Sequence, residues 1–297
     1  MASRGDRLRG WAQGHPPLAG GPTAFVRAPG GQAREGARMS LTPGTIAHTA
    51  LFSLWQRLKL GEGGLLGMVA WLVAWESRDI VVTVLVTGLL ALLLTSLYLF
   101  NDVCDRIVDA HNPKKTAAHR RPLLEQPRTF ALLAVGLHLG VAGAAWYALG
   151  SWAAGSALLL LLLNPLYSLW VKRIPVLDVF TVGVMGGALV GLGTDALDLL
   201  LLAATMTAIS HAFQTRVDER ADRAVGIASS AVAAHRNWIW LALAVAYGCT
   251  VFVRLGALAA ASAALPFLLL RLAHDANPAW MLARVYFGAV WILATVQ

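Results

Sequence analysis

Residues 80–99 read IVVTVLVTGLLALLLTSLYL, and after Phe100 the chain continues into the acidic stretch NDVCDRIVD at residues 101–109. An uncharged apolar run of this length is sufficient for an α-helix to cross the hydrocarbon core of a bilayer, which takes about 20 residues. A strand is excluded, because a membrane-spanning strand needs only about 9–11 residues and alternates between apolar and polar positions. The stretch therefore predicts a transmembrane helix with an acidic end.

The composition of the whole chain agrees with that helix. Of its 297 residues, 57% are hydrophobic and 13% are charged, whereas a soluble domain has about 25% charged residues. This composition excludes a disordered chain and argues against an ordinary soluble enzyme. We predict an all-α, polytopic membrane protein whose nine spans are Leu60–Trp75, Ile80–Leu99, Phe130–Leu149, Trp152–Val171, Val176–Gly193, Leu197–Phe213, Trp238–Val253, Leu255–Leu270 and Ala279–Val296.

The first residues differ from the rest of the chain. Residues 1–43 are rich in Gly, Pro and Arg and contain no apolar run that could form the core of a secretory signal. We predict a disordered basic extension there, with translation starting at Met1 or at Met39, and a transmembrane domain over residues 44–297. The segment Ile46–Lys59 is too short to span and is expected to lie at the membrane interface.

The positive charges are distributed unevenly among the polar joints between the spans. The formal net charge is +8, which in a soluble protein would suggest a nucleic-acid partner. Here fourteen Lys and Arg residues lie in the joints after the second, fourth, sixth and eighth spans or open the ninth, whereas Arg78 and Arg254 lie in the others. The positive-inside rule places the even joints in the cytoplasm. We therefore expect a multi-pass protein of a bacterial inner membrane, with membrane lipids and no nucleic acid as partners.

Acidic residues follow the second span at helical spacing. Asp102, Asp105 and Asp109 are three and four residues apart, so they share one face if the helix continues, and Asn101 adds an amide oxygen beside them. Carboxylates so close together repel one another unless a cation lies between them, and oxygen ligands of this kind suit Mg²⁺. A solvated acidic helix end is the alternative interpretation.

A second set, Gln214, Asp218 and Asp222, follows the sixth span at four-residue spacing. Four spans separate the two sets, so both must face the same side of the membrane, as a shared ligand requires. Cationic side chains accompany the acids: Lys114, Lys115 and Arg121 lie in the joint after the second span, and Lys172 lies in the joint after the fourth. Metal ions together with Lys and Arg donors are suited to a diphosphate, because they neutralise the charge of the leaving group.

These motifs resemble those of the UbiA superfamily of intramembrane prenyltransferases. The family's Asn-Asp-x-x-Asp-x-x-x-Asp motif is similar to Asn101–Asp109, and its Arg-Pro-Leu to Arg121–Leu123. Its Tyr-Ser-x-x-x-Lys-Arg-Ile-Pro-x-x-Asp stretch resembles Tyr167–Asp178, and its Asp-x-x-x-Asp leading to Gly-Ile-x-Ser resembles Asp218–Ser229. The resemblance implies nine helices around a central cavity, with Mg²⁺ holding a prenyl diphosphate between the two aspartate motifs.

The motifs and the resemblance together give the expected site. Catalysis is expected from Asp102, Asp105, Asp218, Asp222 and Lys172. Diphosphate binding is expected from Asn101, Arg57, Lys115, Arg121 and Lys172. Mg²⁺ binding is expected from Asn101, Asp102, Asp105, Asp109, Asp218 and Asp222. The expected reaction is prenyl transfer from a prenyl diphosphate to an aromatic or other lipophilic acceptor.

Some positions depart from the family pattern and leave alternatives open. Ala228 stands where many members have Lys, Gln214 where many have Tyr, and His211 where some have Asp, so the acceptor is open. The stretch from His111 to Lys115 resembles members that transfer phosphoribose from phosphoribosyl diphosphate to a polyprenyl phosphate. A cation-coupled transporter is the alternative of another class, although its acids would lie near the bilayer midplane.

Two further features are expected to serve the structure. His138 lies in the middle of the third span without a second His or Cys one turn away, so a buried, hydrogen-bonded histidine is expected and not a metal ligand. The fifth span carries the glycines Gly183, Gly186, Gly187, Gly191 and Gly193, which are expected to let helices approach closely.

Overall fold

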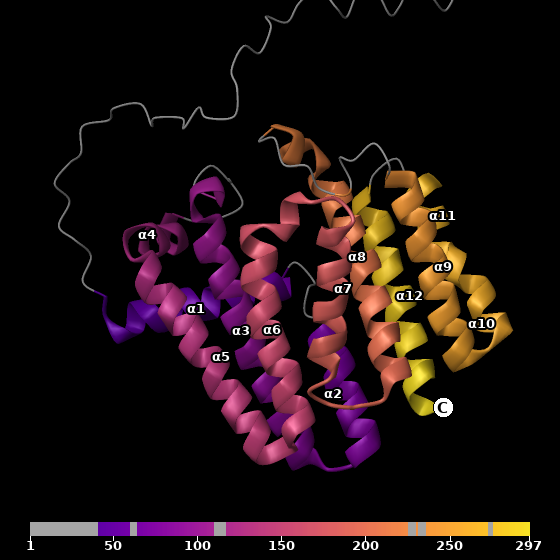
Figure 1. Ribbon diagram of the computed structural model, residues 1–297, viewed down its shortest axis with the longest axis horizontal. Coiled ribbons are helices and arrows are strands. Elements are labelled where there is room, and N and C mark those ends of the chain that lie inside the picture. The colour runs from indigo at the N-terminus through magenta and orange to yellow at the C-terminus, as the bar shows by residue number, and fades with distance from the viewer. Residues whose placement is uncertain (1–40, 60–63, 110–116, 225–229, 231–235, 273–275) are drawn as a thin grey trace, which may run out of the picture. The chain divides into compact units, whose positions relative to one another are not determined.

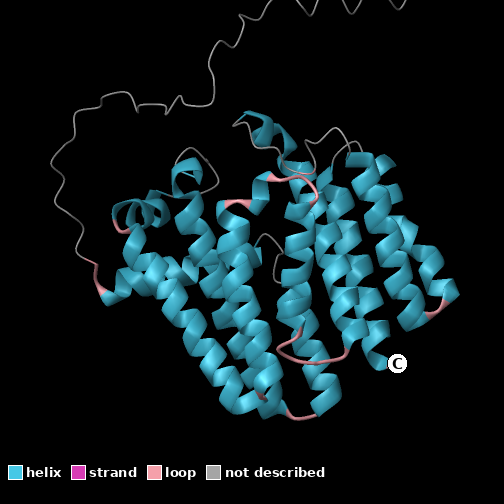
Figure 2. Ribbon diagram, in the orientation of Figure 1, coloured by secondary structure: helices cyan, strands magenta, loops and turns pink. Residues whose placement is uncertain are grey.

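The computed structural model of this chain describes residues 41–59, 64–109, 117–224, 230, 236–272 and 276–297. Its described elements are all helical (Figure 2). They are α1 (Pro43–Lys59), α2 (Gly64–Ser77), α3 (Ile80–Asp109), α4 (Ala117–Glu125), α5 (Pro127–Leu149), α6 (Ser151–Leu169), η1 (Val171–Arg173), α7 (Leu177–Val190), α8 (Leu197–Ala224), α9 (Arg236–Leu255), α10 (Ala257–Ala261), η2 (Ser262–Ala264), α11 (Leu265–Leu272) and α12 (Ala276–Val296). Apart from its last three residues, the predicted N-terminal extension lies outside the described residues.

Among the described residues, six helices are long and apolar enough to cross a membrane. They are Ile80–Arg106, Pro127–Leu149, Ser151–Leu169, Leu197–Arg216, Asn237–Leu255 and Pro278–Val296. Three shorter apolar segments, Gly64–Ser77, Leu177–Val190 and Ala257–Leu268, occupy the places of the other predicted spans. The all-α membrane-type fold is therefore confirmed, whereas the count of nine spans stays a prediction.

The outer surface of the bundle is apolar, as a lipid-facing surface must be. Large side chains such as Leu132, Tyr147, Phe180, Val253 and Leu258 are more than 60% exposed. A soluble protein of this size would not expose so much contiguous apolar surface.

The predicted span Leu255–Leu270 is interrupted in the structure. The chain passes from α10 through the 3₁₀ turn η2 into α11. Pro266 lacks the N–H that would bond the carbonyl of Ser262, four residues earlier, so the α-helical ladder cannot run through this point. Hydropathy alone did not reveal the interruption, because Leu, Ala and Pro there form one apolar run.

Helices α3 and α8 both continue beyond their apolar runs. Helix α3 extends to Asp109 and thus contains the whole first acidic motif, and α8 extends to Ala224 and contains Asp218 and Asp222. The helical continuation on which the shared-face argument depends is therefore confirmed for both motifs. Helix α3 packs against α1, α2, α5 and α6, while α8 packs against α7, α9 and α12 (Figure 1).

Helices α7 and α8 make the most extensive helix–helix contact, and glycines permit it. A Cβ atom added to Gly183 would lie 3.0 Å from the carbonyl oxygen of Ala204, and one added to Gly187 would lie 3.0 Å from that of Leu200. The backbones of the two helices thus approach more closely than larger residues would allow. The expectation of close helix approach at the glycines of the fifth span is confirmed.

His138 ties three helices together. Its Nε2 donates to the carbonyl oxygen of Ala157 in α6 over 2.7 Å, and its Nδ1 hydrogen-bonds Ser96 Oγ in α3 over 2.9 Å. The side chain is 2% exposed. The expectation of a buried, hydrogen-bonded structural histidine is confirmed.

Candidate functional site

The first acidic motif forms an ion pair at the C-terminal end of α3. Both carboxylate oxygens of Asp105 accept hydrogen bonds from Lys172 Nζ, over 2.6 and 2.7 Å. Asp102 lies one helical turn earlier and is only 1% exposed. The structure therefore brings together three residues predicted from the sequence for this site, in a partly solvent-shielded environment where charge interactions are stronger than in water.

Helix α6 supports this end of α3 through two further hydrogen bonds. Ser168 Oγ donates to Asn101 Oδ1 over 3.2 Å, and Asn164 Nδ2 donates to the carbonyl oxygen of Leu97 over 3.2 Å. Both Asn164 and Ser168 are buried. The amide of Asn101 is thus held in place by a neighbouring helix.

The hydrogen-bonded residue pairs that join α3 to α6 and η1 recur every four residues. Leu97, Asn101 and Asp105 are four residues apart on α3, and their partners are four residues apart on α6 and η1. Those partners are Asn164, Ser168 and Lys172. Each step corresponds to one helical turn, so the polar contacts lie in register along the helix pair. Sequence reasoning missed Asn164 and Ser168, although the matching four-residue spacing was a signal for them.

Arg121, predicted to bind diphosphate, is engaged elsewhere. Its Nε donates to Glu125 Oε1 over 2.6 Å, one turn further along α4, and its side chain is 59% exposed.

Other predicted site residues lie partly or wholly outside the description. Asp218 and Asp222 belong to α8, Asp109 to α3 and Arg57 to α1, but their side chains are not among those described. Lys115 lies outside the described residues altogether. Among the side chains that are described, no three His, Cys, Asp or Glu residues gather as a metal site. The full predicted ligand set therefore stays a prediction.

The ends of α3 and α8 that carry the two motifs lie at the same end of the bundle (Figure 1). Lys172, which pairs with Asp105 of α3, belongs to η1, just before α7. Ser230, six residues after the end of α8, donates its backbone N–H to Asp178 Oδ2 in the first turn of α7 over 2.8 Å. The stretch from η1 to the first turn of α7 thus contacts the first motif through Lys172 and, through Asp178, a residue that follows the second motif in the chain.

A polar aromatic pair lies between α6 and α8. Tyr167 Oη and His211 Nε2 are 3.3 Å apart, and their rings meet edge to face with centroids 5.9 Å apart. His211 precedes Asp218 by two helical turns on α8. It is one of the positions where the chain departs from the motifs that it otherwise resembles.

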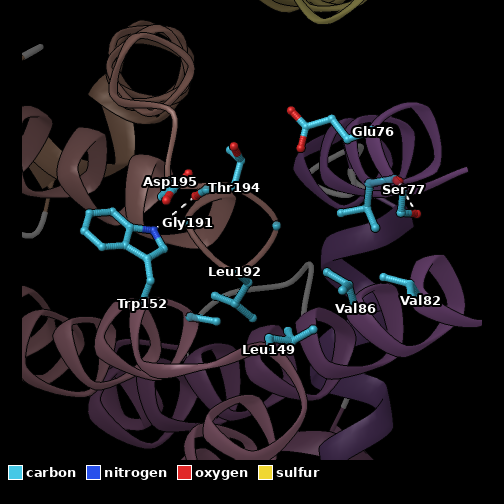
Figure 3. A pocket seen from close by; sticks show the side chains of 13 residues that line it. Glu76, Ser77, Val82, Val86, Leu149, Trp152, Gly191, Leu192, Thr194 and Asp195 are labelled. Carbon is cyan, nitrogen blue, oxygen red and sulfur yellow. Dashed lines mark hydrogen bonds between the residues drawn. The ribbon is translucent and has the colours of Figure 1, made fainter. Parts of the chain in front are cut away.

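A pocket of about 240 Å³ lies at the other end of the bundle (Figure 3). Its walls include Val82, near the start of α3, and Trp152, whose Nε1 donates to the carbonyl oxygen of Thr194 over 3.1 Å. Glu76 and Asp195 also line it.

This pocket is remote from the acidic motifs. The 20 residues of α3 from Val82 to Asp102 correspond to about 30 Å at 1.5 Å per residue. The pocket is therefore distinct from the site at Asp105 and Lys172.

Fold and site together define an α-helical membrane protein with a lysine-paired acidic site at one end of its bundle. The model of the UbiA prenyltransferase family matches residues 64–296, and the chain belongs to this family. No curated protein sequence matches the chain.

Solved structures share the fold. A digeranylgeranylglyceryl phosphate synthase is 16% identical, with a TM-score of 0.61 over 84% of this chain and 97% of the other. A UbiA homologue from Archaeoglobus fulgidus bound to GPP and Mg²⁺ is 16% identical, with a TM-score of 0.57 over 82% and 100% of the two chains. The same homologue bound to DMAPP and Mg²⁺ gives a TM-score of 0.53 at 16% identity over 81% and 98%.

Proposed function

We propose that this protein is a Mg²⁺-dependent intramembrane prenyltransferase that moves a prenyl group from a prenyl diphosphate to an aromatic or other lipophilic acceptor. The observation that carries the proposal is the Lys172–Asp105 ion pair beside buried Asp102, at the polar end of a membrane helix in a UbiA-family chain. The A. fulgidus homologue bound to GPP or DMAPP with Mg²⁺ supports it.

The donor set at this end of α3 fits Mg²⁺. Asp102 and Asp105 offer carboxylate oxygens and Asn101 an amide oxygen, which are the ligands that hard cations prefer. The Lys172 ammonium already lies on both oxygens of Asp105, so this carboxylate accommodates a cation. Mg²⁺ would be held by Asn101, Asp102, Asp105, Asp109, Asp218 and Asp222. When bound, it would neutralise charge on the departing diphosphate.

The chain's own cations would bind the diphosphate oxygens. Lys172 is a donor already placed at Asp105, and Arg57, Lys115 and Arg121 are the others expected from the sequence. Such donors stabilise the charge that grows on the leaving group. The apolar helices would hold the prenyl tail and exclude water, so that the allylic cation left at C1 meets the acceptor before it meets water.

The acceptor carbon attacks C1 and then loses a proton. Cys104, the thiol inside the first motif, follows the buried Asp102 and precedes the lysine-paired Asp105. We expect direct transfer without a prenyl–protein intermediate, because a nucleophilic thiol needs a base paired with it, and the carboxylate next to Cys104 in the sequence, that of Asp105, is already paired with Lys172.

The proposal includes an orientation. The joints that are rich in Lys and Arg face the cytoplasm, nine segments cross the membrane, and the acidic site opens at the cytoplasmic face of a bacterial inner membrane. The three segments shorter than a full span are accommodated by local thinning of the bilayer and by flanking polar side chains that reach toward the interface.

A product screen in detergent tests the proposed function. Purified protein is offered prenyl diphosphates of several lengths with pooled aromatic acceptors, and separately phosphoribosyl diphosphate with polyprenyl phosphate. We expect a prenylated product by mass spectrometry, stoichiometric diphosphate release, and loss of both in EDTA. A product in the second mixture alone would replace prenyl transfer with phosphoribosyl transfer. Cation flux in sealed vesicles without any product would indicate a transporter.

A further inference from the structure

A buried hydrogen-bond cluster joins the start of α7 to the residue stretch that follows the second acidic motif. Asp178 is 1% exposed and Ser230 is 3% exposed. The carboxylate of Asp178 accepts the backbone N–H of Ser230 over 2.8 Å and also the hydroxyl of Ser230. The Ser230 hydroxyl oxygen in turn accepts the backbone N–H of Val176 over 2.8 Å. We refer to Val176, Asp178 and Ser230 as the α7 clasp.

The clasp holds a strained backbone. Val176 has φ +75°, in the left-handed region that β-branched residues rarely adopt. Such a conformation is strained and persists only where surrounding contacts fix it. The bond from Val176 N–H to Ser230 supplies one such contact, and Asp178 fixes the Ser230 hydroxyl that accepts it.

The clasp is continuous with Lys172 through backbone hydrogen bonds. Ile174 N–H donates to the carbonyl oxygen of Val171 over 2.8 Å, and Asp178 N–H donates to that of Ile174 over 3.0 Å. Lys172 lies inside the first of these turns. On its other side, Ser230 follows Asp222 by eight residues in the chain. The clasp therefore connects the segment that carries the lysine of the site to a residue that follows the second motif.

We propose that Asp178 and Ser230 are positioning residues that set the location of Lys172 relative to the second aspartate motif. That Lys172 binds the substrate rests on the proposed function. That the clasp fixes the backbone around Lys172 rests on the observed hydrogen bonds. Neither residue needs to touch the substrate. A small displacement of a charge donor lowers the rate strongly, because an error of about 1 Å in a site costs up to about 100-fold.

Two variants break the clasp in different ways. Ser230→Ala removes the hydroxyl that joins Val176 to Asp178. Asp178→Asn keeps the shape of the side chain but replaces one of the two accepting carboxylate oxygens with an NH₂ group, which cannot accept. It tests the clasp independently if the Ser230→Ala protein does not fold. The matched control is Asp198→Asn. Asp178 and Asp198 each lie in the first turn of a helix and accept the next residue's N–H, from Val179 over 2.7 Å and from Leu199 over 3.0 Å. Asp198 lies at the opposite end of the bundle, where it pairs with Arg254 over 2.8 Å.

The coupling between the clasp and the backbone around Lys172 is first measured without any substrate, by hydrogen–deuterium exchange on the full-length protein. Both variants should speed exchange of the amides of Val176 and of Ile174, beside Lys172, by about tenfold or more, whereas Asp198→Asn should not. Unchanged exchange around Ile174 would overturn the inference whatever reaction the protein catalyses.

The consequence for the site is read from kinetics. The KM for prenyl diphosphate should rise about tenfold in both variants while the KM for the acceptor stays within twofold, a split that general destabilisation would not produce. Faster exchange with an unchanged KM for prenyl diphosphate would overturn the positioning role. If the wild-type protein turns over no prenyl diphosphate, the proposed function fails, and the exchange result alone decides whether the clasp positions Lys172.

Discussion

Lys172 is paired with Asp105 of the first motif, and its effects on catalysis and on folding should separate. Its side chain is 23% exposed and that of Asp105 is 19% exposed. A pair in this intermediate environment contributes little to stability, on the order of 1 kcal/mol or less. A donor aimed at developing charge is worth far more to the rate.

Lys172→Met should therefore lower kcat/KM by about 100-fold or more while the thermal midpoint in detergent moves by only a few degrees. Arg173→Met is the matched control, because it removes the same charge from the next residue, which is exposed. Steady-state product formation measures the rate. Equal activity in Lys172→Met and Arg173→Met would show that the ion pair with Asp105 is only structural.

Asp102 is the buried carboxylate of the first motif, and its charge is expected to serve Mg²⁺ binding. Asp102→Asn preserves the shape of the side chain but removes the charge, so activity should fall by about 100-fold or more and the Mg²⁺ concentration for half-maximal activity should rise. Asp79→Asn is the control at the other end of the same helix. Its Oδ1 accepts Val81 N–H over 2.7 Å, a role that Asn fills equally well.

Mg²⁺ titrations of both variants decide the role of Asp102. A normal Mg²⁺ dependence in Asp102→Asn would contradict it, and an altered dependence in Asp79→Asn would show that the assay reports folding.

The sequence was sufficient to predict the residues expected to bind ligands, but not the residues that hydrogen-bond to them and fix their positions. Asn101, Asp102, Asp105 and Lys172 could be named because acids and a lysine at the rim of an apolar helix are conspicuous. Ser168 and Asn164 are small polar residues in an apolar run, and only their contacts with α3 reveal what they do. The clasp residue Ser230 is separated from Asp178 by 52 positions, a pairing that local pattern cannot predict.

At the scale of helices, hydropathy located the apolar segments well and their interruptions poorly. The continuation of α3 and α8 through the acidic motifs followed from helical spacing of the acids. The division into α10, η2 and α11 depends on a single missing N–H at Pro266, which averages over hydropathy do not register. Where a helix begins and ends depends on individual hydrogen bonds, whereas whether an apolar helix forms at all depends on the hydropathy of many residues together.

The α7–α8 contact offers a test at this scale. A Cβ on Gly186 would overlap the Cβ and Oγ1 atoms of Thr207 and lie 2.7 Å from its Cγ2. Thr is β-branched and cannot turn away easily, so the helices must separate. Gly186→Ala should lower the free energy of unfolding by about 1–3 kcal/mol.

Gly136→Ala on α5 is the matched control, because nothing lies within 4 Å of the added atom and alanine favours the helix by roughly 0.5–1 kcal/mol. Thermal unfolding in one detergent compares the two. A Gly186→Ala protein as stable as Gly136→Ala would show that the helices tolerate a wider separation than the structure has.

At the scale of the whole molecule, charge and hydropathy act together to fix the orientation. The segment Leu177–Val190 is shorter than a full span, and it connects η1, with Lys172 and Arg173, to the joint around Asp195 at the pocket end of the bundle. If this segment crosses the bilayer, Asp195 lies on the side opposite to the joint after α3. If it does not, the positive charges of later joints fall on both sides, in conflict with the positive-inside rule.

Cysteine labelling decides between these topologies. In a background with Cys104→Ser and Cys249→Ala, single cysteines replace Lys115 and Asp195, and intact cells are treated with a membrane-impermeant maleimide. We expect Asp195→Cys to be labelled from outside and Lys115→Cys only after the membrane is opened, because six positive charges lie between the predicted spans Ile80–Leu99 and Phe130–Leu149, whereas the joint at Asp195 carries none. Removing one lysine leaves that asymmetry almost unchanged, so the probe does not alter what it measures. Labelling of both cysteines from one side would mean that α7 does not cross the membrane, and the two aspartate motifs could then share a face only through a different number of spans.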